Sequence, residues 1–211
     1  MPPLVLSGAE LETLLAQRGQ SEDRELEIGC GSGHFACAQA SDNPATLLIA
    51  CEFKGERCRA AAERARRAGL GNLLVVRERG EDLLYRLAAK SLRAVHVYFP
   101  DPWPKARHRR RRLLRWLNLV RMVECLQLGG QIRFVTDFHD YALQARMLTA
   151  LHPQLELART SAFDADALSR YGPRLQALGK SIEHLTATRI STTLPAAGDR
   201  QLVHLLSGSP R

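Results

Sequence analysis

Short apolar runs alternate along most of the chain with longer stretches that carry apolar residues at helical spacing. Five runs have the length of strands and are rich in β-branched or aromatic residues: 26–28, 46–51, 72–76, 94–99 and 132–136. The stretches between them predict helices that begin near His34 or cover 55–68, 81–90, 113–128 and 141–151. This alternation predicts an α/β fold, a mostly parallel sheet with helices on both faces.

The pattern after residue 150 is weaker. Residues 155–157, 183–189 and 201–206 have the composition of strands, and the polar stretch 164–179 contains a predicted turn at Tyr171-Gly172-Pro173. No repeat, linker or low-complexity segment interrupts the pattern, so we expect a single domain over residues 1–211.

Composition excludes several classes of protein. Hydrophobic residues make up 45% and charged residues 25%, values typical of a globular protein. No apolar run approaches the roughly 18 residues of a membrane span, and the N-terminus lacks the features of a secretory signal. The five cysteines have no metal-binding spacing, so we expect buried thiols and no metal site. These features predict a cytoplasmic protein with no membrane contact.

The basic residues are concentrated in one segment. The net charge is +8, and seven basic residues with no acid lie within residues 105–115. A solvated helix face is one explanation, but neighbouring like charges repel one another. A localised contact with a polyanion fits the segment better, and arginines 107–115 would then neutralise phosphates.

A glycine loop follows the first predicted strand. Gly29, Gly31 and Gly33 allow a tight turn and a close approach of the backbone to a ligand, with Glu27 just before them and Glu52 at the end of the next strand. Glycines that serve only the turn are one reading of this pattern. A dinucleotide is a second ligand class, but Glu27 would repel a pyrophosphate. The same carboxylate suits the cationic methionine end of S-adenosylmethionine.

A proline-rich loop follows the strand 94–99. Its residues 100–104 read Pro-Asp-Pro-Trp-Pro, and three fixed φ angles hold Asp101 in a defined place. Trp103 either packs against the protein or stacks on a base. The strand 132–136 ends at a second acid, Asp137. Because parallel strands end at one edge of a sheet, both acids are candidates for the same site.

These motifs resemble those of the bacterial tRNA (guanine-N7-)-methyltransferase family. The matching pieces are residues 27–33, Glu52, residues 99–108 with Arg111 and Arg112, and Thr136-Asp137. The resemblance implies a Rossmann-like class I methyltransferase fold with a seven-stranded sheet. It also implies S-adenosylmethionine as the methyl donor and a guanine in the variable loop of tRNA as the acceptor.

The resemblance assigns roles to individual residues. It implies a short N-terminal helical segment (1–24), a core that binds the cofactor (25–145) and a C-terminal part on the substrate side (146–211). The implied cofactor-binding residues are Glu27, Gly29, Gly31, Gly33, Glu52, Phe53, Glu78, Arg79 and Asp101. The implied substrate-binding residues are Lys105, Arg109, Asp137, Ser169, Arg170 and Tyr171. Arg79 stands where the family often has an acid, and Gly172 where it has a glutamate.

The implied chemistry needs no strong base. Nitrogen 7 of guanine carries a free lone pair, so positioning and a field suited to positive charge are enough. We therefore expect Asp101 to be the catalytic residue through orientation and electrostatics. The expected partner is tRNA, with no metal and no obligate protein partner. Two alternatives are a class I methyltransferase for another RNA or a small molecule, and an RNA-binding relative that has lost catalysis.

Overall fold

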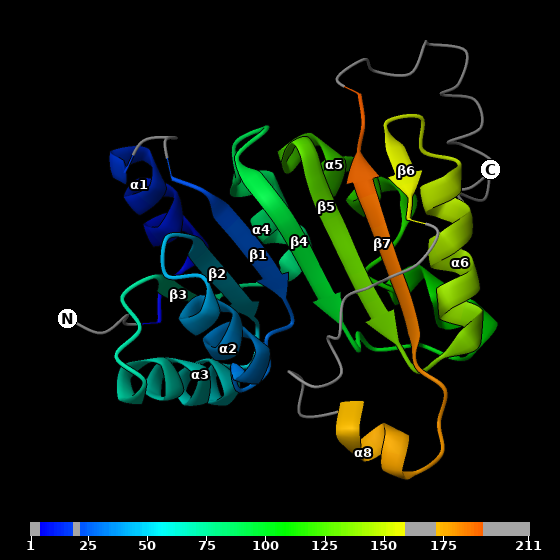
Figure 1. Ribbon diagram of the computed structural model, residues 1–211, viewed down its shortest axis with the longest axis horizontal. Helices are drawn as coiled ribbons and strands as arrows, with labels where there is room; N and C mark the ends of the chain where they lie inside the picture. The colour runs from blue at the N-terminus through cyan, green and yellow to red at the C-terminus, as the bar shows by residue number, and fades with distance from the viewer. Residues whose placement is uncertain (1–4, 19–21, 159–171, 192–211) are drawn as a thin grey trace.

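The computed structural model describes residues 5–18, 22–158 and 172–191. Its described strands form one seven-stranded sheet in the order β3-β2-β1-β4-β5-β7-β6 (Figure 1). The strands are β1 (Arg24–Ile28), β2 (Leu47–Glu52), β3 (Leu73–Arg77), β4 (Leu92–Tyr98), β5 (Leu126–Thr136), β6 (Leu155–Leu157) and β7 (Glu183–Arg189). Strands β1 to β5 pair in parallel, and β7 is antiparallel to both β5 and β6. The predicted α/β fold with a mostly parallel seven-stranded sheet is confirmed.

Helices cover both faces of this sheet. They are α1 (Gly8–Arg18), α2 (His34–Asp42), α3 (Gly55–Arg67), α4 (Gly80–Arg86), α5 (Trp116–Cys125), α6 (His139–Ala150) and α8 (Gly172–Ala177), with a 3-10 turn η1 (Ala106–Arg111). Successive residues of β2 point to opposite faces: Leu48 belongs to the core cluster that contains residues of α2 and α3, whereas Ile49 belongs to the cluster that contains residues of α1, α4, α5 and α6. Both faces of the strand are therefore buried, which explains its continuous apolar sequence.

The boundary between α5 and β5 differs from the sequence prediction. The helix predicted over 113–128 begins at Trp116 and ends at Cys125, and the next eleven residues form β5. Gly129, predicted to follow the helix, lies within this strand at φ +79°, where the pairing with β4 shifts register. The glycine pair therefore accommodates a bulge rather than a helix end.

The C-terminal part also differs in one detail. Strands 155–157 and 183–189 are confirmed. The predicted turn at residues 171–173 is wrong for Gly172 and Pro173, which begin α8, and Tyr171 and the predicted strand 201–206 lie outside the described residues. No helix in the described ranges is both long and apolar enough to cross a membrane.

The order of the strands determines where a ligand can bind. The chain moves outward from β1 through β2 to β3, then returns to pair β4 with the other side of β1. This reversal lies between β1 and β4, and a crevice forms beyond the carboxyl ends of strands at such a point. The glycine loop and the proline-rich loop follow these two strands, so they meet at this crevice.

Candidate functional site

A cleft of about 760 Å³ lies beyond the carboxyl ends of β1 to β4. It brings together six of the residues that the sequence predicted for the site: Gly29, Glu52, Phe53, Glu78, Arg79 and Asp101. Glu27, Gly31, Gly33, Lys105, Arg109 and Asp137 are not among its lining residues. Ser169, Arg170 and Tyr171 lie outside the described residues.

The glycine loop runs from the end of β1 to α2 and is hydrogen-bonded to the end of β2. Gly29, Gly31 and Gly33 all have positive φ, at +83°, +56° and +74°, a conformation that residues other than glycine rarely adopt. The backbone amides of Gly29 and Cys30 donate to the carbonyl of Cys51 at 2.8 and 3.0 Å. The loop therefore turns sharply beside the cleft, as the sequence predicted.

Glu27 is a buried acid with an unused hydrogen-bond acceptor. It is the second-last residue of the strand β1 and is only 4% exposed. The backbone amide of Ala36 donates to the carboxylate, but Oε2 has no partner among the described residues. Burial, and then the charge of Glu52, raises the pKa of Glu27 to about 8. A cationic ligand would favour ionisation of this carboxylate.

The carboxylate of Glu52 is held by the backbone of the two residues that follow it. Its Oε1 accepts from the amides of Phe53 and Lys54, both at 2.9 Å, and its Oε2 lies 3.8 Å from Nη1 of Arg57. The phenyl ring of Phe53 beside it is 56% exposed. A fixed carboxylate next to an open aromatic face can accept hydrogen bonds from the hydroxyl groups of a ligand, while a flat ring of the same ligand packs on the phenyl group.

The acid after β3 is already paired. Glu78 Oε2 accepts from Nε of Arg86 at 2.9 Å, and this carboxylate lies against Gly8 of α1. Arg79 is an exposed residue that lines the same cleft. Glu78 therefore contributes to the cleft while its charge is compensated by Arg86 at the end of α4.

The proline-rich loop has an unusual backbone. Phe99 and Trp103 have positive φ, at +48° and +42°, which is strained for aromatic residues. The amide of Phe99 donates to the carbonyl of Val135 at 2.8 Å and fixes the start of the loop to β5. The exposed side chain of Asp101 lies between the two strained residues and lines the cleft. Strain of this kind persists where the surrounding structure determines the conformation, and it occurs often at functional sites.

The basic run, residues 105–115, does not form one continuous surface. Arg112 is fully buried, and its guanidinium donates to the carbonyl of Pro102 at 2.8 Å, to Gln144 at 2.6 Å and to Asp140 at 2.6 Å. The prediction that the whole run contacts a polyanion is therefore wrong for Arg112, because this side chain already ties the proline-rich loop to α6. Its partners on α6, Asp140 and Gln144, were not predicted from the sequence. Their i, i+4 spacing, which places both side chains on one face of a helix, was the available signal.

Three other arginines of the basic run border the cleft. Arg110, Arg111 and Arg115 line it together with Trp103, and the guanidinium of Arg111 lies 4.9 Å from the centre of the indole ring. Arg109 is instead paired with Asp140 at 2.7 Å. Basic groups and Asp101 thus surround the same opening, as the sequence predicted from their adjacency.

Asp137 lies apart from this opening. It follows β5 and pairs with Nζ of Lys180 at 3.3 Å, just after α8. The prediction that it contacts a substrate is not tested by this arrangement. Lys105 is exposed at the start of η1.

Comparison with known proteins identifies the family. Residues 22–185 match a family model described as a putative methyltransferase. A tRNA (guanine-N(7)-)-methyltransferase of Geobacter metallireducens is 40% identical over 67% of this chain and 69% of its own length. The chain belongs to this methyltransferase family. A second member, from Syntrophotalea carbinolica, is 34% identical to this methyltransferase. The matched residues make up 76% of this chain and 71% of the relative.

Solved structures share the fold of this methyltransferase. The 16S rRNA methyltransferase KamB superposes with a TM-score of 0.64 and 20% identity, covering 90% of this chain and 100% of its own. The tRNA (m1A58) methyltransferase TrmI of Aquifex aeolicus gives a TM-score of 0.54 with 15% identity, covering 88% and 69%. These similarities confirm the Rossmann-like methyltransferase fold.

Proposed function

We propose that this methyltransferase transfers a methyl group from S-adenosylmethionine to nitrogen 7 of a guanine in tRNA. The observation that carries the proposal is one cleft that combines Glu52 on the β2 side with Asp101 and the neighbouring arginines on the β4 side. The family members described above bear the name of this activity. The acceptor nucleotide that we propose lies in the variable loop.

The residues of the β1 and β2 ends fit the methyl donor. S-adenosylmethionine supplies a methyl group attached to a positively charged sulfonium. Glu27 offers a buried oxygen without a partner to the ammonium group, and Glu52 offers a fixed carboxylate to the ribose hydroxyls. Gly29, Gly31 and Gly33 keep the backbone close to the ligand, and Phe53, Glu78 and Arg79 would border its adenine end.

Asp101 is the proposed catalytic residue. The lone pair of guanine nitrogen 7 needs no deprotonation, so the enzyme has to orient the base and stabilise the positive charge that develops on it. Asp101 lies on a constrained loop at the mouth of the cleft, where a carboxylate can do both. We propose no general base.

The RNA would approach from the side of η1 and β5. Lys105, Arg109 and Asp137 are the proposed substrate contacts in the described part of the chain, and Ser169, Arg170 and Tyr171 are proposed outside it. Arg109 would have to exchange Asp140 for a phosphate. The proposal also includes a cytoplasmic location and one domain over residues 1–211, whose parts (1–24, 25–145 and 146–211) have the roles given above.

The deciding experiment measures transfer from labelled S-adenosylmethionine to unmodified tRNA, followed by chemical cleavage at 7-methylguanosine. A single cut in the variable loop is expected. If the protein binds the donor but methylates no tRNA, the proposed acceptor is wrong and another RNA or a small molecule replaces it. If the protein binds tRNA but not the donor, it is an RNA-binding relative without catalysis.

Replacement of Asp101 tests its role. Asp101→Asn keeps the shape of the side chain and removes the charge, so we expect kcat to fall about a hundredfold, the size of effect found for one electrostatic group in an active site. The dissociation constant for tRNA should stay within about twofold, because Arg110 and Arg111 remain. Asp42→Asn, an exposed acid at the end of α2, is the matched control. Equal kcat values for the two variants would contradict a catalytic role.

A further inference from the structure

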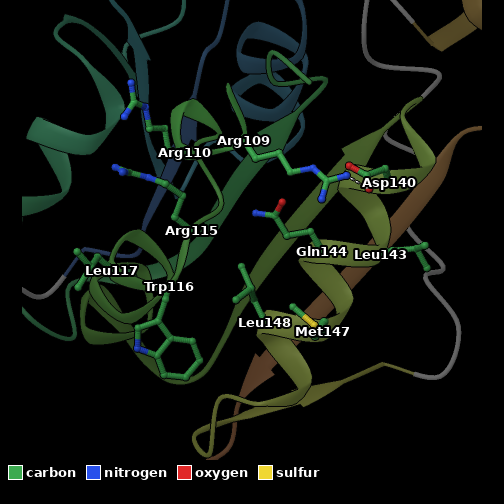
Figure 2. A pocket seen from close by; sticks show the side chains of 10 residues that line it. All are labelled: Arg109, Arg110, Arg115, Trp116, Leu117, Asp140, Leu143, Gln144, Met147 and Leu148. Atoms are coloured by element: carbon green, nitrogen blue, oxygen red, sulfur yellow. Dashed lines mark hydrogen bonds and ion pairs between the residues drawn. The ribbon is translucent and has the colours of Figure 1, made fainter. Parts of the chain in front are cut away.

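A second hollow adjoins the cleft. It has a volume of about 490 Å³ and lies between η1, the start of α5 and α6 (Figure 2). This volume is within the range of small-molecule sites. Its floor is apolar and is formed by Trp116, Leu117, Leu143, Met147 and Leu148. None of these residues has a role in the donor site described above.

Three residues of the apolar floor are open to solvent. Leu117, Leu143 and Met147 are 57%, 53% and 49% exposed, although large apolar side chains usually pack in the core. Trp116 is only 9% exposed, with its ring 5.5 Å from that of His152, and so forms a rigid wall. A contiguous apolar surface with a polar rim is typical of a binding site.

The rim of the hollow is basic. Arg109, Arg110 and Arg115 lie on it with one acid, Asp140, which is already paired with Arg109 and with the buried Arg112. Within the described ranges, no carboxylate forms an ion pair with Arg110 or Arg115, and the buried Nε of Arg115 has no hydrogen-bond partner. The rim therefore suits an anionic group.

Two of these arginines belong to both hollows. Arg110 and Arg115 line the cleft as well as the second hollow, so they form the divide between them. Their guanidinium groups extend away from Trp116 and Leu148 in Figure 2, whereas Arg109 turns toward Asp140. A ligand that spans the divide would place an anion on the arginines and an apolar group on each side.

We propose that the second hollow binds the base of a nucleotide next to the target guanine, unstacked from its RNA, with the connecting phosphate on Arg110 and Arg115. Bases bind to aromatic and apolar side chains without a requirement for sequence, and the phosphate supplies the negative charge. This inference rests on the proposed function for its RNA, but it concerns a separate surface. Continuity with the cleft favours RNA over a second copy of the chain as the occupant.

The first test combines a protein change with an RNA change. Met147→Glu puts a negative charge on the exposed floor in a residue type that helices accept. An RNA substrate in which one neighbour of the target guanine is abasic should bind the wild-type protein about tenfold more weakly, a typical loss for one stacked base. The same abasic substitution should cost the Met147→Glu variant nothing further. Leu128→Glu, at another exposed apolar position, on β5, should keep the tenfold loss.

The second test does not depend on methylation. Trp103 and Trp116 are the two tryptophans of the chain, so Trp103→Phe leaves Trp116 as the single indole reporter. A short single-stranded oligoribonucleotide should quench its fluorescence to saturation, and Met147→Glu should abolish the quenching. The Leu128→Glu control should quench normally.

The two tests separate failure of the site from failure of the function. Methyl transfer to tRNA without quenching and without the abasic coupling would overturn the nucleotide site and leave the proposed function standing. Saturable quenching without methyl transfer would support the nucleotide site and overturn the proposed function. If Met147→Glu turns a dimer into a monomer in sedimentation while RNA binding is unchanged, the hollow is an interface between copies and the proposal is wrong.

Discussion

Arg111 and Arg112 are neighbours in one basic run, yet their surroundings give them opposite roles. Arg111 is exposed, stacks over Trp103 and borders the cleft. Arg112 is buried, and its guanidinium lies 4.7 Å from the centre of the ring of Tyr141. The planar, permanently charged guanidinium suits both tasks, because it can donate in several directions and stack on rings. Composition alone cannot separate these roles, since they depend on burial.

Substitution by methionine should separate them experimentally. Arg112→Met removes hydrogen bonds to Pro102 and Gln144, so we expect the free energy of unfolding to fall by about 2–3 kcal/mol, as for hydrogen bonds from a charged group. Arg111→Met should leave the melting temperature unchanged and weaken tRNA binding. Calorimetry and a binding titration on both variants would show the difference. Equal melting temperatures would contradict the assignment of Arg112 to the loop anchor.

The buried Glu27 should make stability depend on pH. Its pKa is near 8 in the folded protein against 4.5 for an ordinary glutamate, so the folded state holds the proton where the unfolded state has lost it. The free energy of unfolding therefore falls as pH rises from about 4.5 to 8. Glu27→Gln cannot ionise, so its melting temperature should exceed that of the wild-type protein by more at pH 8 than at pH 5.

The exposed Glu56 provides the control for this measurement. Glu56→Gln should follow the wild-type melting temperature at both pH values. Glu27→Gln should also bind S-adenosylmethionine more weakly, since the proposed site loses its negative charge. A Glu27→Gln melting temperature that changes with pH as the wild-type value does would refute the buried-acid explanation.

At the scale of the elements, the sequence predicts strands better than helix ends. The strands are apolar on both faces or alternate regularly, and these periods are visible without any tertiary contact. The end of α5 is different, because Leu126 leaves the helix to pair with Leu92 across the sheet. Residues 113–128 have a helical pattern throughout, so only the neighbouring strand decides where the helix stops.

The junction of the glycine loop with α3 depends on Gly33. An added Cβ there would lie 2.9 Å from Cβ of Ala61, and φ is +74°. Gly33→Ala should therefore lower the free energy of unfolding by the cost of the left-handed conformation, about 1–2 kcal/mol, and by a further steric contribution. Gly69→Ala, at φ +66° with nothing within 4 Å, carries the conformational cost alone.

Chemical denaturation of both alanine variants would measure this difference. The Gly33 variant should be the less stable of the two. If the two lose the same free energy of unfolding, the loop and α3 are not closely packed in solution.

At the scale of the whole molecule, the proposed donor side of the site could be predicted from the sequence because parallel topology brings strand ends together. Glu27 and Glu52 lie at the carboxyl ends of β1 and β2, and Asp101 follows β4, which pairs with the other side of β1. The second hollow could not be predicted in this way. It is formed by η1, α5 and α6, and the hydrogen bonds of the buried Arg112 join the end of η1 to α6. The charge of the basic run is visible in the sequence, but the apolar hollow beside it is not.

The strand order also has an evolutionary consequence. Glu27, Glu52 and the glycine loop precede residue 92, whereas Asp101, the arginines and α6 all follow it. A gene of this kind can accumulate substitutions in its second half, and so acquire a new acceptor, without changing the half that carries the proposed donor site. Divergence of acceptor preference within such a lineage should therefore be concentrated downstream of β4.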